Sequence, residues 1–148
     1  MIKEKLYHKC LAILNSRIEK YKAELELIKE SMENDEKNAD DDEGNGSGNI
    51  SGDSYAKTLQ YLDEVTKMKD SLKKVNIFQD NEVVKHGSLV ECSNGLFFIS
   101  IPLGKIEMDG QNYFAISTEA PVGKLLQGKK EGESVSFNNN IFKINKIH

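Results

Sequence analysis

Apolar side chains recur at intervals of three and four residues through the first part of this 148-residue chain. The spacing places them on one side of an α-helix, in the heptad pattern of a coiled coil. No Gly or Pro precedes Gly44, so nothing in the sequence ends this helix early. Such a helix cannot bury its apolar stripe alone and needs a partner helix. The stripe comprises Tyr7, Leu11, Leu14, Ile18, Tyr21, Leu25, Ile28 and Met32.

A second apolar series with the same spacing predicts the partner helix. Ser51 and Asp53 stand just before this series and are suited to cap the helix N-terminus. The two stripes bury each other if the second helix folds back on the first as an antiparallel hairpin. A long dimeric coiled coil is the alternative, but the break at residues 34–53 favours the hairpin. The series comprises Tyr55, Leu59, Leu62, Val65, Met68, Leu72 and Val75.

Residues 34–53 are expected to form an acidic, mobile tip between the two helices. They hold seven acidic residues, one Lys and four Gly, so like charges repel and little favours order. The formal net charge of the chain is −4, and residues 33–43 alone carry −6. The rest of the chain therefore sums to +2. The chain is a nearly neutral body with a concentrated acidic segment.

From about residue 76 the pattern changes to short β-type runs. Asn94-Gly95 and Asp109-Gly110 are typical hairpin turns, and Asn139 lies in a third turn. Pro121 and Gly128 are placed to begin and end one short helix. We therefore expect an α+β chain, with a helical hairpin over residues 1–75 and a small antiparallel β domain with one short helix over residues 76–148. The predicted strands span residues 88–92, 96–101, 113–117, 134–138 and 141–147.

Composition excludes several classes of protein. The acidic balance argues against a duplex-binding protein, which needs a basic face. The longest apolar runs, such as residues 96–101, are too short to span a membrane, and the N-terminus lacks the apolar core of a signal peptide. Cys10 and Cys92 form no metal or redox motif and are expected to be reduced thiols of a cytoplasmic protein. Thiol catalysis is disfavoured because His8 and Cys10, two residues apart, do not share a helix face.

Residues 120–133 carry a motif. Their sequence, A-P-V-G-K-L-L-Q-G-K-K-E-G-E, resembles the S-P-(I/L)-G-x-A-L-(L/I)-G-K-x-x-G-(D/E) signature of the Gre transcript-cleavage factors. Ala120 replaces the usual Ser. A generic helix–turn–strand is the alternative interpretation of this segment. The matching residues are Pro121, Gly123, Leu126, Gly128, Lys129, Gly132 and Glu133.

The resemblance extends to the architecture. Gre factors consist of an N-terminal antiparallel coiled-coil hairpin and a C-terminal FKBP-like domain, in the order expected here. The resemblance implies that the partner is bacterial RNA polymerase. The C-terminal domain would dock at the rim of the secondary channel, and the hairpin would carry its tip toward the active site. Candidate polymerase-contacting residues are Pro121, Gly123, Lys124, Gly128, Lys129 and Lys130.

The resemblance also implies metal chemistry at the tip. Phosphodiester hydrolysis in a polymerase uses two metal ions, and Mg²⁺ prefers carboxylate oxygen. The family tip reads approximately G-D-(L/I)-S-E-N-A-E-Y, whereas residues 48–55 read G-N-I-S-G-D-S-Y, one residue shorter. Asn49 takes the place of the first acid, and the second falls on Gly52 or Asp53. Candidate ligands for a Mg²⁺ ion shared with the polymerase are Asp53, Asn49, Asp40, Asp41, Asp42 and Glu43.

Several functions remain open from the sequence. The protein would be no enzyme itself, but a cofactor to cleavage by the polymerase, or a channel-binding regulator that does not cleave. A peptidyl-prolyl isomerase is a weaker alternative, because the chain has no Trp and its strand aromatics (Phe97, Phe98, Tyr113 and Phe114) suit a core. A helical-hairpin adaptor is another. We expect a monomer, with no direct specific binding to nucleic acid and no membrane association.

Overall fold

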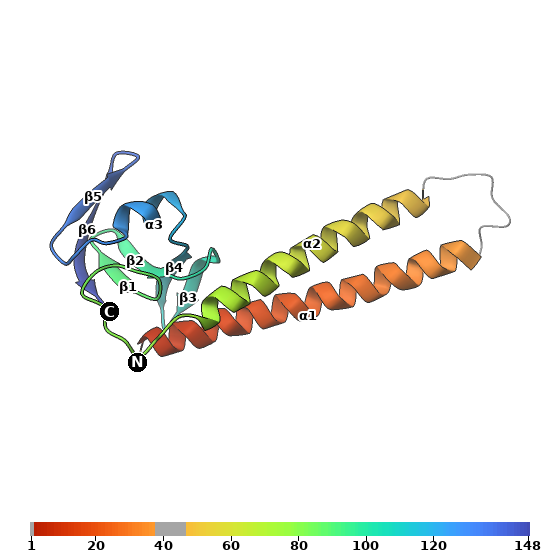
Figure 1. The fold of residues 1–148 in the computed structure, drawn as a ribbon, viewed down its shortest axis with the longest axis horizontal. Coiled ribbons are helices and arrows are strands. Elements are labelled where there is room, and N and C mark those ends of the chain that lie inside the picture. Colours follow the sequence, from red (N-terminus) through yellow and green to blue (C-terminus); the bar gives the residue numbers. More distant parts are fainter. Residues whose placement is uncertain (1, 38–46) are drawn as a thin grey trace. The chain divides into compact units, whose positions relative to one another are not determined.

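The computed structural model describes residues 2–37 and 47–148. The chain forms two compact units. One unit is Ala12–Lys69, and the other combines Met1–Leu11 with Asp70–His148. Two long helices, a six-stranded sheet and one short helix make up the described chain, so the expected α+β class is confirmed (Figure 1). Within the described residues, no helix is long and apolar enough to cross a membrane.

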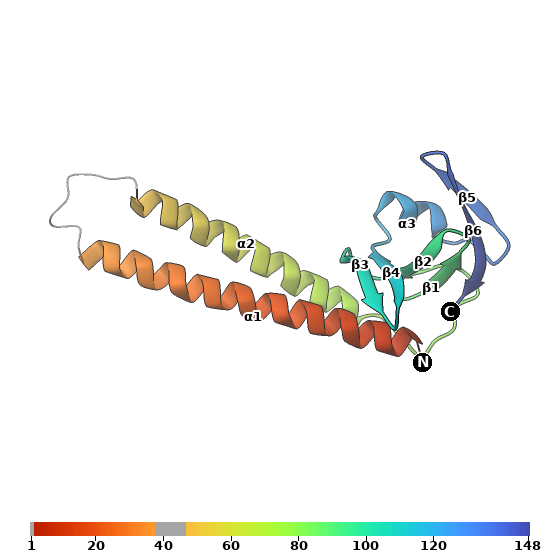
Figure 2. The same cartoon turned by 180° about the vertical axis from the view of Figure 1, so that it is seen from behind.

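Helices α1 (Ile2–Lys37) and α2 (Ser47–Lys73) form the expected antiparallel hairpin (Figures 1 and 2). In the unit Ala12–Lys69, the rings of Tyr21 and Tyr61 lie 5.9 Å apart across the two helices. The apolar stripe of α1 is mostly half-buried in this unit, and Leu14 is its fully buried member. Partial burial follows from the architecture, because two helices cover only one side of each other.

The expected tip of residues 34–53 is too long. Residues 34–37 end α1 and residues 47–53 begin α2, so only residues 38–46 lie outside the described residues. The predicted N-cap role of Ser51 and Asp53 is also wrong, because α2 already begins at Ser47. Adding a residue to an established helix costs little, so the helix extends across Gly52, whose missing side chain would meet open space.

The buried face of α2 differs from the predicted stripe at one position. Leu59 is 47% exposed, whereas the preceding Thr58 is only 7% exposed. The following stripe members Leu62 and Val65 are half-buried and buried. Spacing alone allowed either position 58 or 59, since both lie within one turn of Leu62. Packing therefore selected the smaller, polar residue for the buried side.

The second unit is built on a sheet of strand order β3-β4-β2-β1-β6-β5. All neighbouring strands are antiparallel except β2 and β4, which are parallel. The purely antiparallel sheet that the sequence predicted is wrong at that pair, and β3 was not predicted. The chain leaves β2 and forms β3 at the sheet edge before β4 inserts beside β2. The strands are β1 (Leu89–Cys92), β2 (Gly95–Ile99), β3 (Gly104–Met108), β4 (Gln111–Ile116), β5 (Ser134–Phe137) and β6 (Asn140–Ile147).

Both faces of this sheet are buried. One face packs Val90 and Ile99 into a cluster with Leu126 from the short helix α3 (Pro121–Leu126). Because side chains alternate along a strand, Leu89 and Phe98 lie on the opposite face, and they too are fully buried. The expectation that Phe97, Phe98 and Tyr113 are core residues is confirmed. The helix ends in the same unit add the fully buried Leu6, Cys10 and Leu72.

Polar contacts hold the helix ends in this unit. Lys3 is a buried residue, and its ammonium donates a hydrogen bond to the Gln79 carbonyl at 2.7 Å. Burial lowers the pKa of Lys3, and the nearby Asp80 carboxylate partly opposes that effect. His86 Nε2 lies 3.2 Å from the Ser71 carbonyl oxygen. These contacts fix the segment that joins α2 to β1.

Candidate functional site

The motif-bearing segment begins with α3, which starts as the sequence predicts. Pro121 occupies the first turn, where its missing N–H costs nothing. Ala120 is the N-cap and has no side chain that can cap the helix. Instead, the Ala120 N–H donates to the hydroxyl and carbonyl oxygens of Ser117, both at 3.2 Å. Ser117 therefore satisfies the N–H of the N-cap residue, whereas the N–H groups of the first turn of α3 have no side-chain cap.

Gly123 is required by a close approach between two backbone segments. A Cβ atom at this position would lie 2.1 Å from the Ser117 carbonyl oxygen and 3.3 Å from the Thr118 Cα. No side chain fits there without a backbone shift. Gly123 is buried, so the structure gives it a packing role and no surface for a partner to contact.

The turn after α3 is held by backbone pairing with the segment before β1. Gly128 has a φ of +82°, a left-handed conformation that glycine adopts freely. Its N–H donates to the Val84 carbonyl at 2.8 Å, and the Val84 N–H donates to the Lys129 carbonyl at 2.9 Å. The predicted helix end at Gly128 is confirmed, with the last helical residue at Leu126.

Two acidic side chains stabilise the following turn into β5. The Lys130 N–H donates to Glu133 Oε2 at 2.6 Å, which closes the turn. The Ile147 N–H donates to Glu131 Oε1 at 3.1 Å, which joins the turn to β6. Gly132 has a φ of +88° and donates its N–H to the Ile144 carbonyl. Most motif positions therefore have a structural role that can be read from the hydrogen bonds.

The side chains of α3 and its exit turn that remain accessible are largely basic. Lys124 and Lys130 are exposed and Lys129 is half-buried, and within residues 2–37 and 47–148 none of the three forms an ion pair. Leu125 lies beside them with 38% of its surface exposed, and Pro121 is also exposed. We name these five residues the α3 surface. It combines unpaired positive charge with a small apolar area.

At the other candidate site, Asn49 and Asp53 lie in the first two turns of α2. Positions four apart lie on the same side of a helix, and the Asp53 side chain is exposed. The candidate ligands Asp40, Asp41, Asp42 and Glu43 lie outside the described residues. In the described part of the chain, no group of three His, Cys, Asp or Glu residues could hold a metal ion. Those residues alone therefore form no complete metal site.

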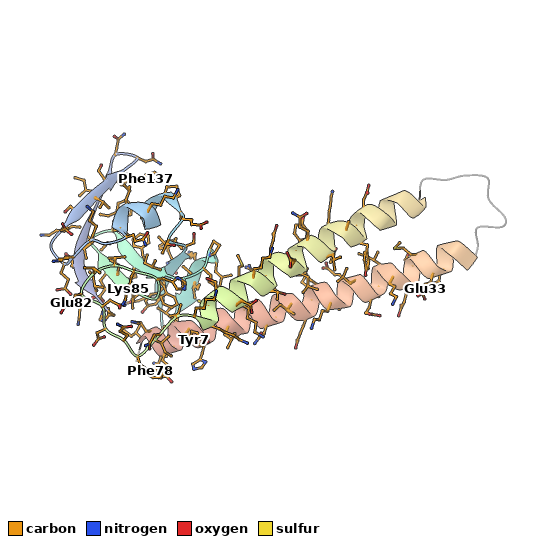
Figure 3. All side chains as sticks on the ribbon, viewed as in Figure 1. Tyr7, Glu33, Phe78, Glu82, Lys85 and Phe137 are labelled. Atoms are coloured by element: carbon orange, nitrogen blue, oxygen red, sulfur yellow. The ribbon has the colours of Figure 1, made fainter. Side chains whose placement is uncertain are left out.

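Acidic residues also gather at the end of α1. Glu30 and Glu33 are exposed in its last turns, and Glu33 lies near the hairpin end in Figure 3. The C-terminus of a helix carries a partial negative charge that acts within about the last turn, so Glu33, four residues before Lys37, is disfavoured by at most about 0.3–1 kcal/mol and Glu30 by less. The sequence places this charge where it reduces helix stability. A cation near the tip would offset that cost.

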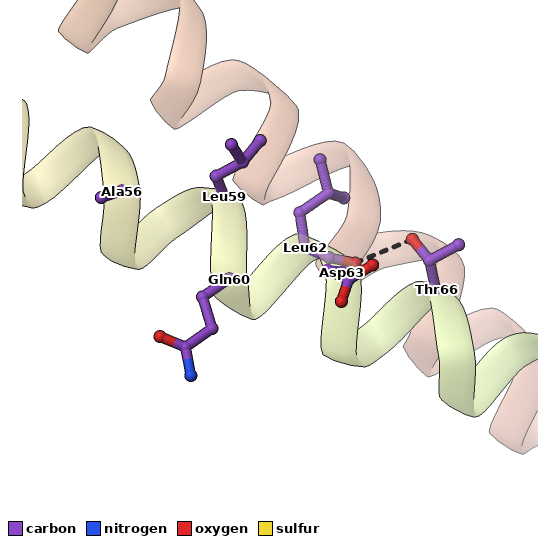
Figure 4. A pocket seen from close by; sticks show the side chains of 6 residues that line it. All are labelled: Ala56, Leu59, Gln60, Leu62, Asp63 and Thr66. Atoms are coloured by element: carbon purple, nitrogen blue, oxygen red, sulfur yellow. Dashed lines mark hydrogen bonds between the residues drawn. The ribbon is translucent and has the colours of Figure 1, made fainter.

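A hollow runs along one side of α2 in the unit Ala12–Lys69. Its volume is about 590 Å³ and its lining includes Leu59, Leu62 and Asp63. Figure 4 shows Gln60 pointing away from the two leucines, and the Thr66 hydroxyl donating to the Leu62 carbonyl at 2.7 Å. Asp63 forms an ion pair with Lys67, which lies one turn along the helix. Among the described residues that line the hollow, none carries an unpaired charge that would select a ligand.

The sequence did not indicate the exposure of Phe78, which is 72% exposed. Phe78 follows Asn76, whose side-chain oxygen accepts a hydrogen bond from the Phe78 N–H at 3.1 Å. With Tyr7 and Ile77 it lines a second hollow of about 480 Å³. An Asn two residues before an aromatic is a recognisable signal for a turn. Nothing in the sequence alone distinguishes this Phe from a core residue.

The two thiols are poor candidates for chemistry. Cys10 and Cys92 are both buried and unpaired with each other. Burial raises the pKa of each thiol to about 11. The thiolate is the nucleophilic form, so a raised pKa opposes catalysis at neutral pH.

No protein-family model matches the chain, and no curated protein sequence matches it. A solved structure of the transcription factor Gfh1 is similar to this chain with a TM-score of 0.39 and 20% sequence identity. The similarity covers 95% of this chain and 94% of that chain.

Proposed function

We propose that this chain is a Gre-like transcription factor that binds bacterial RNA polymerase at its secondary channel and presents the hairpin tip to the polymerase active site. The observation that carries the proposal is the joining, in one chain, of a long helical hairpin with an acidic tip to a domain that bears the Gre-type segment 120–133. The protein acts on a site that belongs to its partner. It carries out no complete reaction alone.

The dimensions of the hairpin support this function. Residues 12–37 of α1 correspond to about 39 Å of helix at a rise of ~1.5 Å per residue. Residues 33–43, which carry a net charge of −6, lie at and just beyond the end of α1. The helices thus act as a spacer for a segment of high local negative charge that follows α1 in the sequence. Such a charge suits metal ions and opposes approach to free phosphates.

Metal chemistry explains the acidic tip. Mg²⁺ binds carboxylate oxygen and keeps several waters, and as a Lewis acid it supplies an activated water and charge stabilisation. Asp53, exposed in the second turn of α2, offers a carboxylate. The remaining ligands would come from residues 40–43 and from the polymerase. We therefore assign the tip a supporting role toward a shared metal ion.

The α3 surface is the proposed docking site on the second unit. Three lysines without ionic partners in the described chain lie in the same segment as the partly exposed Leu125, so the surface offers both charge and apolar contact. Bacterial RNA polymerase would need a complementary acidic and apolar patch. Replacing Lys124, Lys129 and Lys130 with Ala tests this assignment, with Lys105→Ala and Lys143→Ala as exposed controls on other elements.

A non-cleaving channel regulator is the second candidate. It is favoured by Asn49, a neutral residue at a position where the Gre tip has an acid. At most one of the two paired acids of the family pattern stays in register here. The same hairpin would then modulate elongation or initiation by occupying the channel.

One assay separates these functions. Purified protein is added to backtracked elongation complexes with Mg²⁺, and both polymerase binding and RNA shortening are measured. A cleavage factor produces shortened RNA. This product is expected to disappear with Asp53→Asn or when residues 40–43 are neutralised, and to remain with the control Asp63→Asn. Binding without shortened RNA supports the regulator. Absence of binding at moderate salt refutes the proposed function as a whole.

A further inference from the structure

The two edges of the sheet differ in how they are protected. Edge strands expose unpaired backbone groups and are usually guarded by charged residues or Pro. Strand β3, at one edge, carries exposed Lys105 and Glu107 and follows Pro102. Strand β5, at the other edge, has the sequence Ser-Val-Ser-Phe and contains no charged residue and no Pro. The second edge therefore lacks these protections.

The turn between β5 and β6 shows which backbone groups face outward. Asn138 and Asn139 both have positive φ, 51° and 66°, as in the type I′ turn of a two-residue hairpin. In such a hairpin the closing pair, here Phe137 and Asn140, is hydrogen-bonded. Hydrogen-bonded and non-hydrogen-bonded pairs alternate along an antiparallel ladder, so the next hydrogen-bonded pair is Val135 with Phe142. Val135 therefore bonds to β6, while the N–H and C=O groups of Ser134 and Ser136 point to the open edge.

These outward groups have no other partner in the described chain. The backbone N–H and C=O groups of Ser134 and Ser136 make no hydrogen bond to a loop or turn among residues 2–37 and 47–148. The two side chains are exposed, small and neutral. The edge thus offers a repeating donor and acceptor pattern that another extended backbone matches.

We propose that β5 pairs with β5 of a second copy of this chain, antiparallel and centred on Val135. In this register Ser134 of one copy lies opposite Ser136 of the other, and the reverse holds on the far side of the two-fold axis. All four outward groups of each strand are then satisfied, which gives four hydrogen bonds. Registers centred on Ser134 or Ser136 leave some of these outward N–H and C=O groups without a partner. The pattern is therefore self-complementary in one register only.

Side chains in this register favour the pairing. Neutral Ser opposes neutral Ser, so no like charges meet across the new ladder. Ile141, directly opposite Ser136 on β6, is 66% exposed and lies on the same face of the sheet. Ile141 lies one strand in from the new ladder, about 9–10 Å from the added strand, so the four hydrogen bonds and not this side chain carry the pairing.

The interface is small and the expected association is weak. A pairing of four residues per copy lies well below the roughly 1,200 Å² that stable interfaces bury. We expect self-association at protein concentrations on the order of 0.1–1 mM. This differs from the strict monomer that the sequence suggested, and it does not depend on the proposed function in transcription.

Sedimentation equilibrium over a concentration series tests the proposal with the full chain. Ser136→Pro removes one outward N–H from each copy and keeps the bonds to β6, so it is expected to weaken association by at least roughly tenfold. Ser136→Ala keeps the backbone groups and is expected to leave association unchanged. Circular dichroism of the dilute variants checks that each remains folded.

A mixing experiment tests the register. Ser136→Lys and Ser134→Glu place opposite charges across the ladder only when the two variants pair with each other. The mixture is expected to associate more strongly than either variant alone. A monomer at all concentrations, an association that survives Ser136→Pro, or a mixture no stronger than its components would each overturn the proposal.

Discussion

Replacement of Gly123 by Ala tests how the motif-bearing segment is packed. The added Cβ would lie 2.1 Å from the Ser117 carbonyl oxygen, whereas ordinary contacts begin near 3.4 Å. The backbone on one side must therefore move by about 1 Å, and overpacking of this kind costs about 1–3 kcal/mol or more. Ala is favoured over Gly in a helix by about 1 kcal/mol, which offsets only part of that cost. We expect a net loss of about 2 kcal/mol of unfolding free energy.

Two other glycines serve as matched controls in the same urea titration. Gly52 lies in α2, and a Cβ at this position would meet no atom within 4 Å, so Gly52→Ala is expected to gain up to about 1 kcal/mol. Gly128 is equally uncrowded but has a φ of +82°, so Gly128→Ala is expected to cost about 1–2 kcal/mol through backbone strain alone. Tyrosine fluorescence and far-UV circular dichroism report the transitions. Equal or greater stability of Gly123→Ala would refute the close approach between α3 and Ser117.

Other stability changes follow from burial. Leu59→Ala is expected to cost under about 1 kcal/mol because Leu59 is half exposed, whereas Leu72→Ala at a fully buried site costs about 2–5 kcal/mol, as measured by urea titration. Lys3→Met removes the hydrogen bond to the Gln79 carbonyl and is expected to cost about 0.5–1.5 kcal/mol in the same assay. Burial raises the pKa of Cys10 and Cys92 to about 11, so their contribution to stability is complete below pH 9.0 and is lost as the pH rises toward 11. Each thiol is expected to account for about 1–2 kcal/mol of this pH-dependent stability. The unfolding free energy of the parent and of Cys92→Ala is therefore compared between about pH 8 and about pH 10.5. An equal loss of stability in the two proteins would contradict the raised pKa of Cys92.

Part of the candidate site was predictable from the sequence. Local chemistry identifies the start of α3 at Pro121 and its end near Gly128, because both depend on backbone preferences within a few residues. The reason for Gly123 was not predictable, because it depends on the approach of the Ser117 carbonyl. The exposure of the α3 lysines also follows only from packing. Sequence order alone does not show which charged side chains find ionic partners.

Local patterns in the sequence specify the helical hairpin, most strands and the acidic character of the tip. Heptad spacing and alternation are local periodic signals, and each is strong enough to select its secondary structure. The tertiary structure decided the rest. Strand β3 has one buried apolar residue, Ile106, and is extended because β4 supplies its hydrogen bonds.

Tertiary packing also decided which residues of the helix ends are buried. Lys3 and Cys10 lie one helical turn before the stripe members Tyr7 and Leu14, and Leu6 lies one turn before Cys10. All three are buried, and the first turns of α1 belong to the unit that contains the sheet. Lys3, for example, donates a hydrogen bond to the carbonyl of Gln79, 76 residues away. Contacts of that range are absent from local sequence patterns, which is why only the folded structure shows them.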